Sequence, residues 1–240
     1  MTVEPMVDVL AMAAHRDDVE QTCGGTLLRM RAQGYRTGIL DMTRGEAGTR
    51  GSAAEREAEA RSAAAILGVR WREALDIPDG CVENTYESRL KVVAALRRAR
   101  PRVVIVPYWE GRHPDHYTTA TLGYEACFLA GLAKVDTGMP AHRPFKILYA
   151  SLYADVRPSF VVDITPYIED RHRALMAYTS QYGNQEQGSG LFVPEEEIRE
   201  RTFAMARHFG LLAGVRYAEP FVQKEVGLVD DIAMLGVASI

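Results

Sequence analysis

The residues best suited to chemistry lie in the segment "AHRDDVE", residues 14–20. It places His15 beside two adjacent carboxylates, Asp17 and Asp18, directly after the apolar run "VDVLAMA". Imidazole nitrogen and carboxylate oxygen both bind Zn²⁺. Two neighbouring aspartates can therefore take different roles, one as a metal ligand and one as a base that removes a proton from water. The alternative is that both aspartates simply cap the helix that follows.

A second segment, "EGRHPDHYT" (residues 110–118), repeats this arrangement after another apolar run, "RVVIVPY". It contains His113 and His116, two of the six histidines of the chain, together with Asp115. By itself it can be a proline turn in which Asp115 caps a helix that begins near Tyr117. If the two apolar runs are neighbouring strands, both segments line one crevice and can enclose one divalent ion. With a further histidine to stabilise an oxyanion or protonate a leaving amine, the set is suited to hydrolysis of an amide or an ester.

The rest of the pattern predicts the elements that position these segments. Short apolar runs predict strands at residues 7–14, 35–43, 102–108, 145–151 and 159–165, with a weaker one at 71–77. Helical spacing and capping signals predict helices over residues 19–30 (capped by Gly34), 52–68, 87–100 (ended by Pro101) and 198–212. This alternation predicts an α/β fold with a Rossmann-like, mostly parallel sheet flanked by helices. Such sheets carry functional residues in loops at the carboxyl ends of their strands.

Composition excludes several classes of protein. The 240 residues suit a single domain over 1–240, with 47% hydrophobic and 25% charged residues. A formal charge of −4 and a pI near 5.9 give no basic surface for nucleic acid. No apolar run is long enough to cross a membrane, and the N-terminus lacks signal-peptide features, so we expect a cytoplasmic protein. Three widely spaced cysteines argue against a disulfide framework and a thiolate metal cluster.

The motifs A-H-x-D-D-x-E and H-P-D-H resemble those of the PIG-L/LmbE family of zinc-dependent N-acetylglucosamine deacetylases. The resemblance covers nearly the whole chain. Between the two motifs, "TRGEAGTRGSAAEREAEARSAAAILGV" is similar to the family's second-strand exit and following helix. "GRHPDH", "YTSQY" and "GVRYAEPF" resemble the branch that deacetylates N-acetylglucosaminyl-L-malate in bacillithiol biosynthesis. The resemblance implies that malate glycoside as substrate; the alternative is another N-acetylated sugar, such as a chitooligosaccharide or an antibiotic or thiol precursor.

Carried over position by position, the resemblance also implies roles for the residues of the two segments. It implies that His15, Asp18 and His116 bind zinc and that Asp17 is the general base. It implies that His113 stabilises the tetrahedral oxyanion or acts as general acid. Another divalent ion such as Fe²⁺ is compatible with the same donors.

Three arginines complete the expected site. The resemblance implies that Arg56, on the helix after the second strand, holds substrate. From the sequence pattern alone, Arg56 is expected to be a solvated helix residue. Arg112 adjoins the second metal-binding segment, and we expect it to bind the malate carboxylates, because guanidinium binds carboxylate in a bidentate manner. Arg16 stands where the family usually has proline, which fixes φ and stiffens a turn. We expect zinc binding to survive this exchange, with an effect on rate or substrate choice.

Two other classes of function compete with a hydrolase. Strand–helix alternation is also typical of dinucleotide-binding oxidoreductases, but no G-x-G-x-x-G follows the first strand, and "CGGT" (residues 23–26) falls inside the predicted first helix. A non-catalytic metal- or sugar-binding protein is the second alternative. A base beside three metal ligands argues against it, because binding alone needs no base.

A few segments carry weaker expectations. The resemblance implies a homo-oligomer, a trimer or a hexamer, so the apolar segment 124–135 is either an oligomer interface or an ordinary buried helix. The polar segment 179–190 is the best candidate for a mobile flap. Two acidic residues near the expected crevice, Glu20 and Glu46, are expected either to support the site or to be helix-end or loop charges. The histidines outside the two segments are expected to be structural: His142, His172 and His208.

Overall fold

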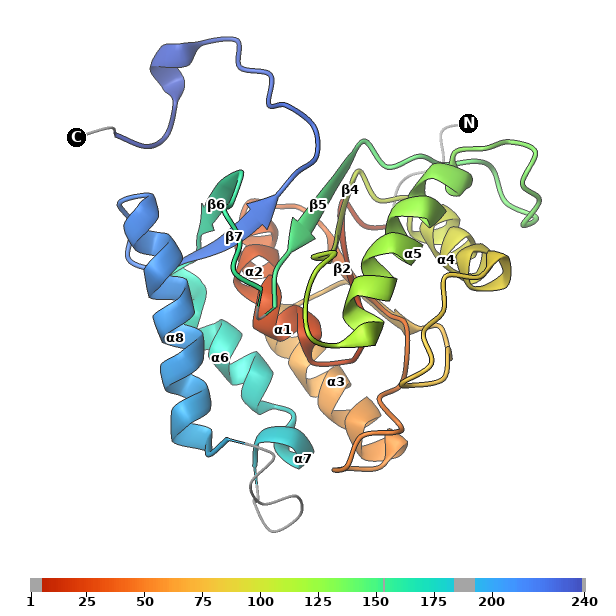
Figure 1. Ribbon diagram of the computed structural model, residues 1–240, viewed down its shortest axis with the longest axis horizontal. Helices are drawn as coiled ribbons and strands as arrows, with labels where there is room; N and C mark the ends of the chain where they lie inside the picture. Colours follow the sequence, from red (N-terminus) through yellow and green to blue (C-terminus); the bar gives the residue numbers. More distant parts are fainter. Residues whose placement is uncertain (1–5, 153, 184–192, 239–240) are drawn as a thin grey trace.

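The computed structural model describes residues 6–152, 154–183 and 193–238. Within these residues, seven strands form one sheet in the order β3-β2-β1-β4-β5-β7-β6 (Figure 1). The strands are β1 (Val9–Ala13), β2 (Thr37–Asp41), β3 (Trp71–Ala74), β4 (Val103–Pro107), β5 (Lys146–Ala150), β6 (Phe160–Asp163) and β7 (Ala218–Val222). The five strands from β3 to β5 in this order are parallel, whereas β7 runs antiparallel to β5 and β6. The α/β fold expected from the sequence is confirmed.

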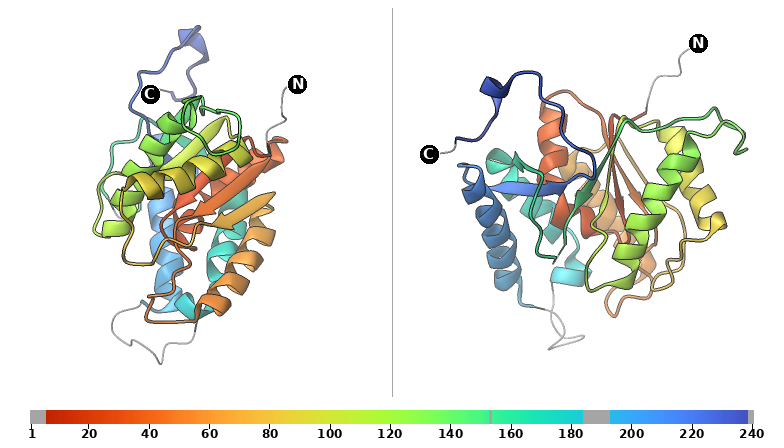
Figure 2. Two further views of the ribbon diagram at one scale, coloured as in Figure 1. Left: turned by 90° about the vertical axis from the view of Figure 1, so that its right-hand side faces the viewer. Right: turned by 45° about the horizontal axis from the view of Figure 1, so that its top comes forward.

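Helices cover both faces of the sheet (Figure 2). They are α1 (Asp18–Thr22), α2 (Gly24–Ala32), α3 (Ala53–Leu67), α4 (Tyr86–Ala99), α5 (Pro114–Ala130), α6 (Ile168–Met176), α7 (Thr179–Tyr182) and α8 (Glu195–Leu212), with 3-10 turns η1 (Thr165–Tyr167) and η2 (Ile232–Met234). Helices α4 and α5 pack together on one face, and α1, α2, α3 and α6 lie on the other. Helix α8 packs along β6 and β7. No helix of the described chain is long and apolar enough to cross a membrane.

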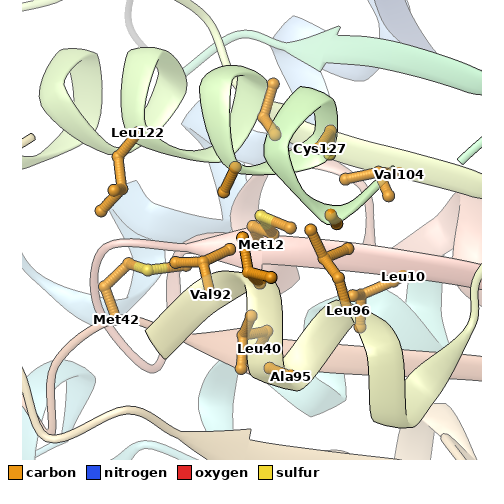
Figure 3. Close-up of a cluster of buried hydrophobic side chains, with 14 of the residues drawn as sticks. Leu10, Met12, Leu40, Met42, Val92, Ala95, Leu96, Val104, Leu122 and Cys127 are labelled. Atoms are coloured by element: carbon orange, nitrogen blue, oxygen red, sulfur yellow. The ribbon is translucent and has the colours of Figure 1, made fainter. Parts of the chain in front are cut away.

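The central strands are buried on both sides, which explains why their sequences are almost continuously apolar. In β1, Leu10 and Met12 point towards α4 and α5, while Val9, Ala11 and Ala13 point towards the opposite helices. The first of these two cores is drawn in Figure 3. Because side chains alternate along a strand, one short run fills both cores and fixes where the strand ends. The polar residues that follow are thereby placed at the edge of the sheet.

The predicted first helix is wrong in one respect, because it is interrupted at Cys23. Cys23 leaves helical geometry, with φ −145° and ψ 17°, and α2 begins afresh at Gly24. The buried carboxylate of Glu219 in β7 accepts hydrogen bonds from the backbone N–H groups of Gly25 (2.9 Å) and Thr26 (2.6 Å). A carboxylate there satisfies donors that a helix start leaves unpaired, so the second start is stabilised from a distant strand.

Other boundaries follow local signals. Ser52 and Glu55 form the expected capping box of α3, and Gly68 ends it in the left-handed conformation at φ 64°. Helix α5 begins at Pro114, earlier than the expected Tyr117, because proline is favoured in a first helical turn. Strand β7 had no sequence prediction.

The structure describes only part of what was expected for the segments 179–190 and 124–135. In segment 179–190, residues 179–182 form α7, and residues 184–190 lie outside the described residues. In segment 124–135, the helix ends at Ala130 and buries Cys127, whereas Phe128 is exposed. Its use as an oligomer interface stays a prediction.

Candidate active site

The segment that carries His15, Asp17 and Asp18 is a tight turn between β1 and α1. The N–H of Asp18 donates to the carbonyl of His15 (3.4 Å), and Asp17 has φ −103° and ψ −5°, as at the third position of a type I turn. The N–H of His15 donates in return to the Asp18 carboxylate at 2.9 Å. Neither aspartate side chain caps α1 in the usual way. The turn therefore leaves both carboxylates for other partners.

The second segment meets this turn across the carboxyl ends of the paired strands β1 and β4. His15 Nδ1 lies 3.1 Å from His116 Nε2. Asp18 lies beside both rings, with Oδ1 at 3.2 Å from His116 Nε2 and Oδ2 at 3.5 Å from His15 Nδ1. The three residues expected to be ligands thus form one cluster. Two other groups bring possible donor atoms within 4.8 Å of one another: His15 with His113 and His116, and His15 with Asp79 and Asp115.

The electrostatics of the cluster favour a cation. Burial would lower the pKa of His15, but the carboxylates of Asp18 and Asp79 outweigh it and raise that pKa to about 11. Burial would raise the pKa of Asp18, yet His116 and His15 hold it well below the usual range. Without an ion, a proton supplies positive charge beside the buried carboxylate. Two imidazoles and one carboxylate are also a common donor set for divalent metals, so the residues fit a metal ion.

His113 lies at the edge of this cluster and is the N-cap of α5. Its Nδ1 accepts a hydrogen bond from the backbone N–H of Asp115 at 3.2 Å. Its ring centroid is 4.7 Å from that of His15 and 4.8 Å from that of His116. Burial and the neighbouring imidazoles lower its pKa. A neutral His113 that accepts at Nδ1 carries its proton on Nε2, where it can donate a hydrogen bond.

Asp17 has surroundings quite different from those of Asp18. Its Oδ1 accepts from Arg56 Nη2 at 3.0 Å, and its Oδ2 accepts from the hydroxyl of Tyr182 and from Gln21 Nε2 at 3.4 Å. Arg56 is only 4% exposed, so it is not a solvated helix residue, and it also donates to the carbonyl of Gly45. Arg56 thus contacts the expected base directly; contact with substrate stays a prediction.

The sequence pattern of PIG-L, described as GlcNAc-PI de-N-acetylase, matches residues 10–127, which include both segments of the cluster. Over 237 residues the chain is 32% identical to diacetylchitobiose deacetylase of Thermococcus kodakarensis, and the alignment covers 90% of this chain and 84% of that protein. The chain belongs to the PIG-L family. It is accordingly a deacetylase, an enzyme that hydrolyses amides.

Two solved structures share the fold of this PIG-L chain. The conserved protein TT1542 of Thermus thermophilus is 41% identical with a TM-score of 0.85, and the alignment covers 93% of this chain and 97% of that one. N,N'-diacetylchitobiose deacetylase of Pyrococcus horikoshii, complexed with an inhibitor, is 27% identical with a TM-score of 0.78, covering 89% and 82% respectively. The similarity therefore extends well beyond the residues that the family pattern matches.

The PIG-L site contains two carboxylates whose positions the sequence did not reveal. Asp79, in the loop after β3, lies 3.1 Å from His15 Nε2 and also accepts from the N–H of Ala47. Asp115 does not cap α5; it accepts from the N–H groups of Gly80 (2.9 Å) and Val82 (3.4 Å). Carboxylates in such positions orient a histidine ring that binds metal. The sequence feature that could have indicated Asp79 is its position directly after the weak strand predicted at residues 71–77, which is β3 beside β2.

A buried network lies directly beneath the PIG-L turn. The backbone carbonyl of Arg16 accepts hydrogen bonds from both Arg72 Nη2 and the Tyr178 hydroxyl. Arg72 also donates to Asp41 (2.8 and 3.0 Å) and to Glu20 (2.8 Å). Glu20 and Asp41 are fully buried, and burial raises the pKa of Glu20 to about 7. These side chains hold the turn at the residue where the family usually has proline.

The remaining candidates lie around or outside the PIG-L site. Arg112 is exposed and adjoins His113. Glu46 accepts from the N–H of Asp79 at 2.8 Å, so it supports the loop that contacts His15. The other histidines lie elsewhere, on the loop before β5 and on helices α6 and α8: His142, His172 and His208.

Proposed function

We propose that this chain is a metal-dependent deacetylase that acts on an N-acetylated amino sugar, with a chitooligosaccharide such as diacetylchitobiose as the first candidate. The observation that carries the proposal is the meeting of His15, Asp18 and His116 beside Asp17, which has partners of its own. Two of the related proteins are diacetylchitobiose deacetylases. These relatives favour the chitooligosaccharide alternative over the malate glycoside of the bacillithiol pathway.

In this proposal His15, Asp18 and His116 hold one divalent ion, with zinc as the first candidate. Such an ion supplies Lewis acidity and lowers the pKa of bound water towards about 7. Asp18 is the preferred carboxylate because it lies between both histidines. His113 is left out of the ligand set because its Nδ1 already accepts a backbone hydrogen bond.

The other side chains divide the proton transfers. Asp17 takes a proton from the attacking water, and Arg56 and Tyr182 keep its carboxylate oriented while it does so. Water attacks the acetamide carbon, and the tetrahedral oxyanion accepts a hydrogen bond from His113 Nε2. Asp17 then gives the proton that it took from water to the departing nitrogen, the C–N bond breaks, and acetate and the free amine are released.

The test is an acetate-release assay on purified protein stripped of metal and reloaded with Zn²⁺ or Fe²⁺. Its substrates are N-acetylglucosamine, diacetylchitobiose and N-acetylglucosaminyl-L-malate. Asp17→Ala should retain bound metal and lose about 10²–10⁴-fold in turnover, the usual worth of a general base. Asp18→Ala should instead lose the metal. Metal uptake without acetate release from any acetylated amino sugar would support the binding-protein alternative.

A specific observation keeps the malate glycoside as second candidate. Arg112 is exposed next to His113, where a guanidinium can reach an anionic aglycone. Arg112→Ala should then raise KM for the malate glycoside more than for free N-acetylglucosamine. Equal effects on the two substrates would remove this argument and leave the chitooligosaccharide.

A further inference from the structure

A hollow lies on the β4–β5 side of the His/Asp cluster, and the proposed reaction does not yet use it. Asp18 and His116 line one part of it. Apolar side chains of β1, of β4, of the residue between α1 and α2, and of the end of β5 with the loop that follows it line most of the rest: Met12, Cys23, Ile105, Val106, Pro107, Ala150 and Leu152. Its volume is about 380 Å³, including the space open to solvent. Apolar walls beside metal-binding residues suggest a place for an apolar part of the substrate.

The polar lining groups leave this character intact. The hydroxyl of Thr22 already donates to the backbone carbonyl of Asp18 at 2.8 Å. Tyr108 and Glu110 belong to the segment that leaves β4, and Glu110 is exposed. In contrast, Ile105 and Ala150 are each 2% exposed and Cys23 is 1% exposed.

Strand order separates two kinds of environment around the cluster. The loops after β2 and β3 lie on one side of β1 and carry charged groups, including Arg56 at the start of α3 and Asp79. Strands β4 and β5 lie on the other side and form the apolar hollow. An amide at the cluster has a sugar on its nitrogen and an alkyl group on its carbonyl carbon. Sugar hydroxyls need polar partners, whereas burial of an alkyl group is favourable against apolar walls.

We propose that this hollow receives the acyl chain of the substrate amide, and that Ile105 and Ala150 set how long that chain can be. The inference rests on the proposed function and adds its acyl specificity. Both side chains are buried on adjacent strands and belong to the same apolar cluster as Cys23. Each methylene that the hollow buries is worth about 0.8 kcal/mol, and one methylene changes kcat/KM by about 10–200-fold in an apolar pocket.

The experiment compares three variants on glucosamines that carry N-acyl chains of two to six carbons. Ile105→Val adds room for about one methyl group and should shift the preferred chain towards greater length, with about a tenfold gain for chains just beyond the wild-type limit. Ala150→Val fills the hollow and should shift the preference the other way. Ile39→Val is the matched control, because Ile39 is fully buried in β2 and does not line the hollow. The control should leave the ratio of kcat/KM values unchanged.

A binding measurement separates this inference from the proposed reaction. Calorimetry of zinc-loaded protein with acetate, propionate, butyrate and hexanoate should give affinity that rises with chain length and falls in Ala150→Val. If acetate is released but neither variant shifts the chain preference, the hollow does not hold the acyl group, and deacetylation stands. If no N-acylated amino sugar is hydrolysed, the proposed reaction fails; a rising carboxylate series then supports the acyl hollow, and a flat series overturns it.

Discussion

Replacing Tyr178 with phenylalanine tests whether the buried network holds the turn that carries His15 and Asp18. The Tyr178 side chain is fully buried, and its hydroxyl donates to the carbonyl of Arg16 and to Glu20 Oε1 (3.1 Å). The substitution removes these hydrogen bonds and leaves the ring in place. It therefore changes the support of the turn with little change in packing.

The magnitude follows from what the acceptors keep. A buried hydrogen bond contributes about 0.5–1.5 kcal/mol net, and more when an acceptor is left unsatisfied. Arg72 still donates to both the Arg16 carbonyl and Glu20 after the change, so neither acceptor is left without a partner. We expect the free energy of unfolding to fall by about 1–2 kcal/mol. For a chain of this size, Tm then falls by about 2–8 °C.

Tyr149→Phe is the matched control. Tyr149 is 2% exposed in β5, and its hydroxyl has no hydrogen-bond partner among the residues that the structure describes. Removing a buried hydroxyl that has no partner should be neutral or slightly stabilising. Urea unfolding of both variants gives the two free energies directly. Equal losses in the two variants would refute the argument, because the loss would then not depend on the hydrogen bonds of Tyr178.

A second measurement connects the network to the site. If the network holds the turn, Tyr178→Phe should weaken zinc binding by about tenfold, the lower end of what groups supporting metal ligands contribute. Arg72→Met should lower the free energy of unfolding by about 3–5 kcal/mol, more than Tyr178→Phe, because it leaves Glu20 and Asp41 buried without their cation. Unchanged zinc affinity in a destabilised Tyr178→Phe would limit the network to a role in folding.

Three further outcomes are expected. Asp8→Asn should lower the free energy of unfolding by about 0.5–1 kcal/mol at pH 7, because hydrogen bonds from Arg36 hold the pKa of Asp8 below its usual value in a partly exposed pair. Urea titrations should show that the difference from wild type shrinks as the pH falls below about 4, where the Asp8 carboxylate becomes protonated. Glu219→Ala should lower the free energy of unfolding by about 3–5 kcal/mol in thermal unfolding, because it removes the cap of α2 and leaves the buried Arg171 without its ion-pair partner. Zinc at 100 times its Kd should stabilise the protein by about 2.7 kcal/mol and fail to do so in His116→Ala, as melting curves with and without chelator would show.

The sequence predicted the two segments well because each depends on local rules. An apolar run of five or more residues fixes a strand, and polar residues directly after it must lie at the strand's end. This reasoning brought His15 and His116 to one edge of the sheet, and the structure confirms that they meet. Which of the nearby carboxylates faces them could not be derived from spacing. Asp79 enters from the weakest predicted strand, and its contact with His15 depends on the order β3-β2-β1.

The features missed by sequence reasoning depend on long-range contacts. The break at Cys23 reflects a carboxylate from residue 219, which is separated from Gly25 by 194 positions. Strand β7 contains Glu219 and Pro220 and enters the sheet antiparallel, so neither its composition nor the strand–helix alternation indicated it. Tyr182 reaches Asp17 only because α6 and α7 fold back beside α3.

The adjacent aspartates show how one turn can supply two chemically different carboxylates. Asp18 lies between His15, which follows β1, and His116 of α5, so its carboxylate faces two imidazoles. Asp17, one residue earlier, is held by Arg56 and Tyr182 from α3 and α7. Because the two carboxylates share a backbone turn but no partners, a change in α3 or α7 can alter the surroundings of Asp17 and leave the contacts of Asp18 in place.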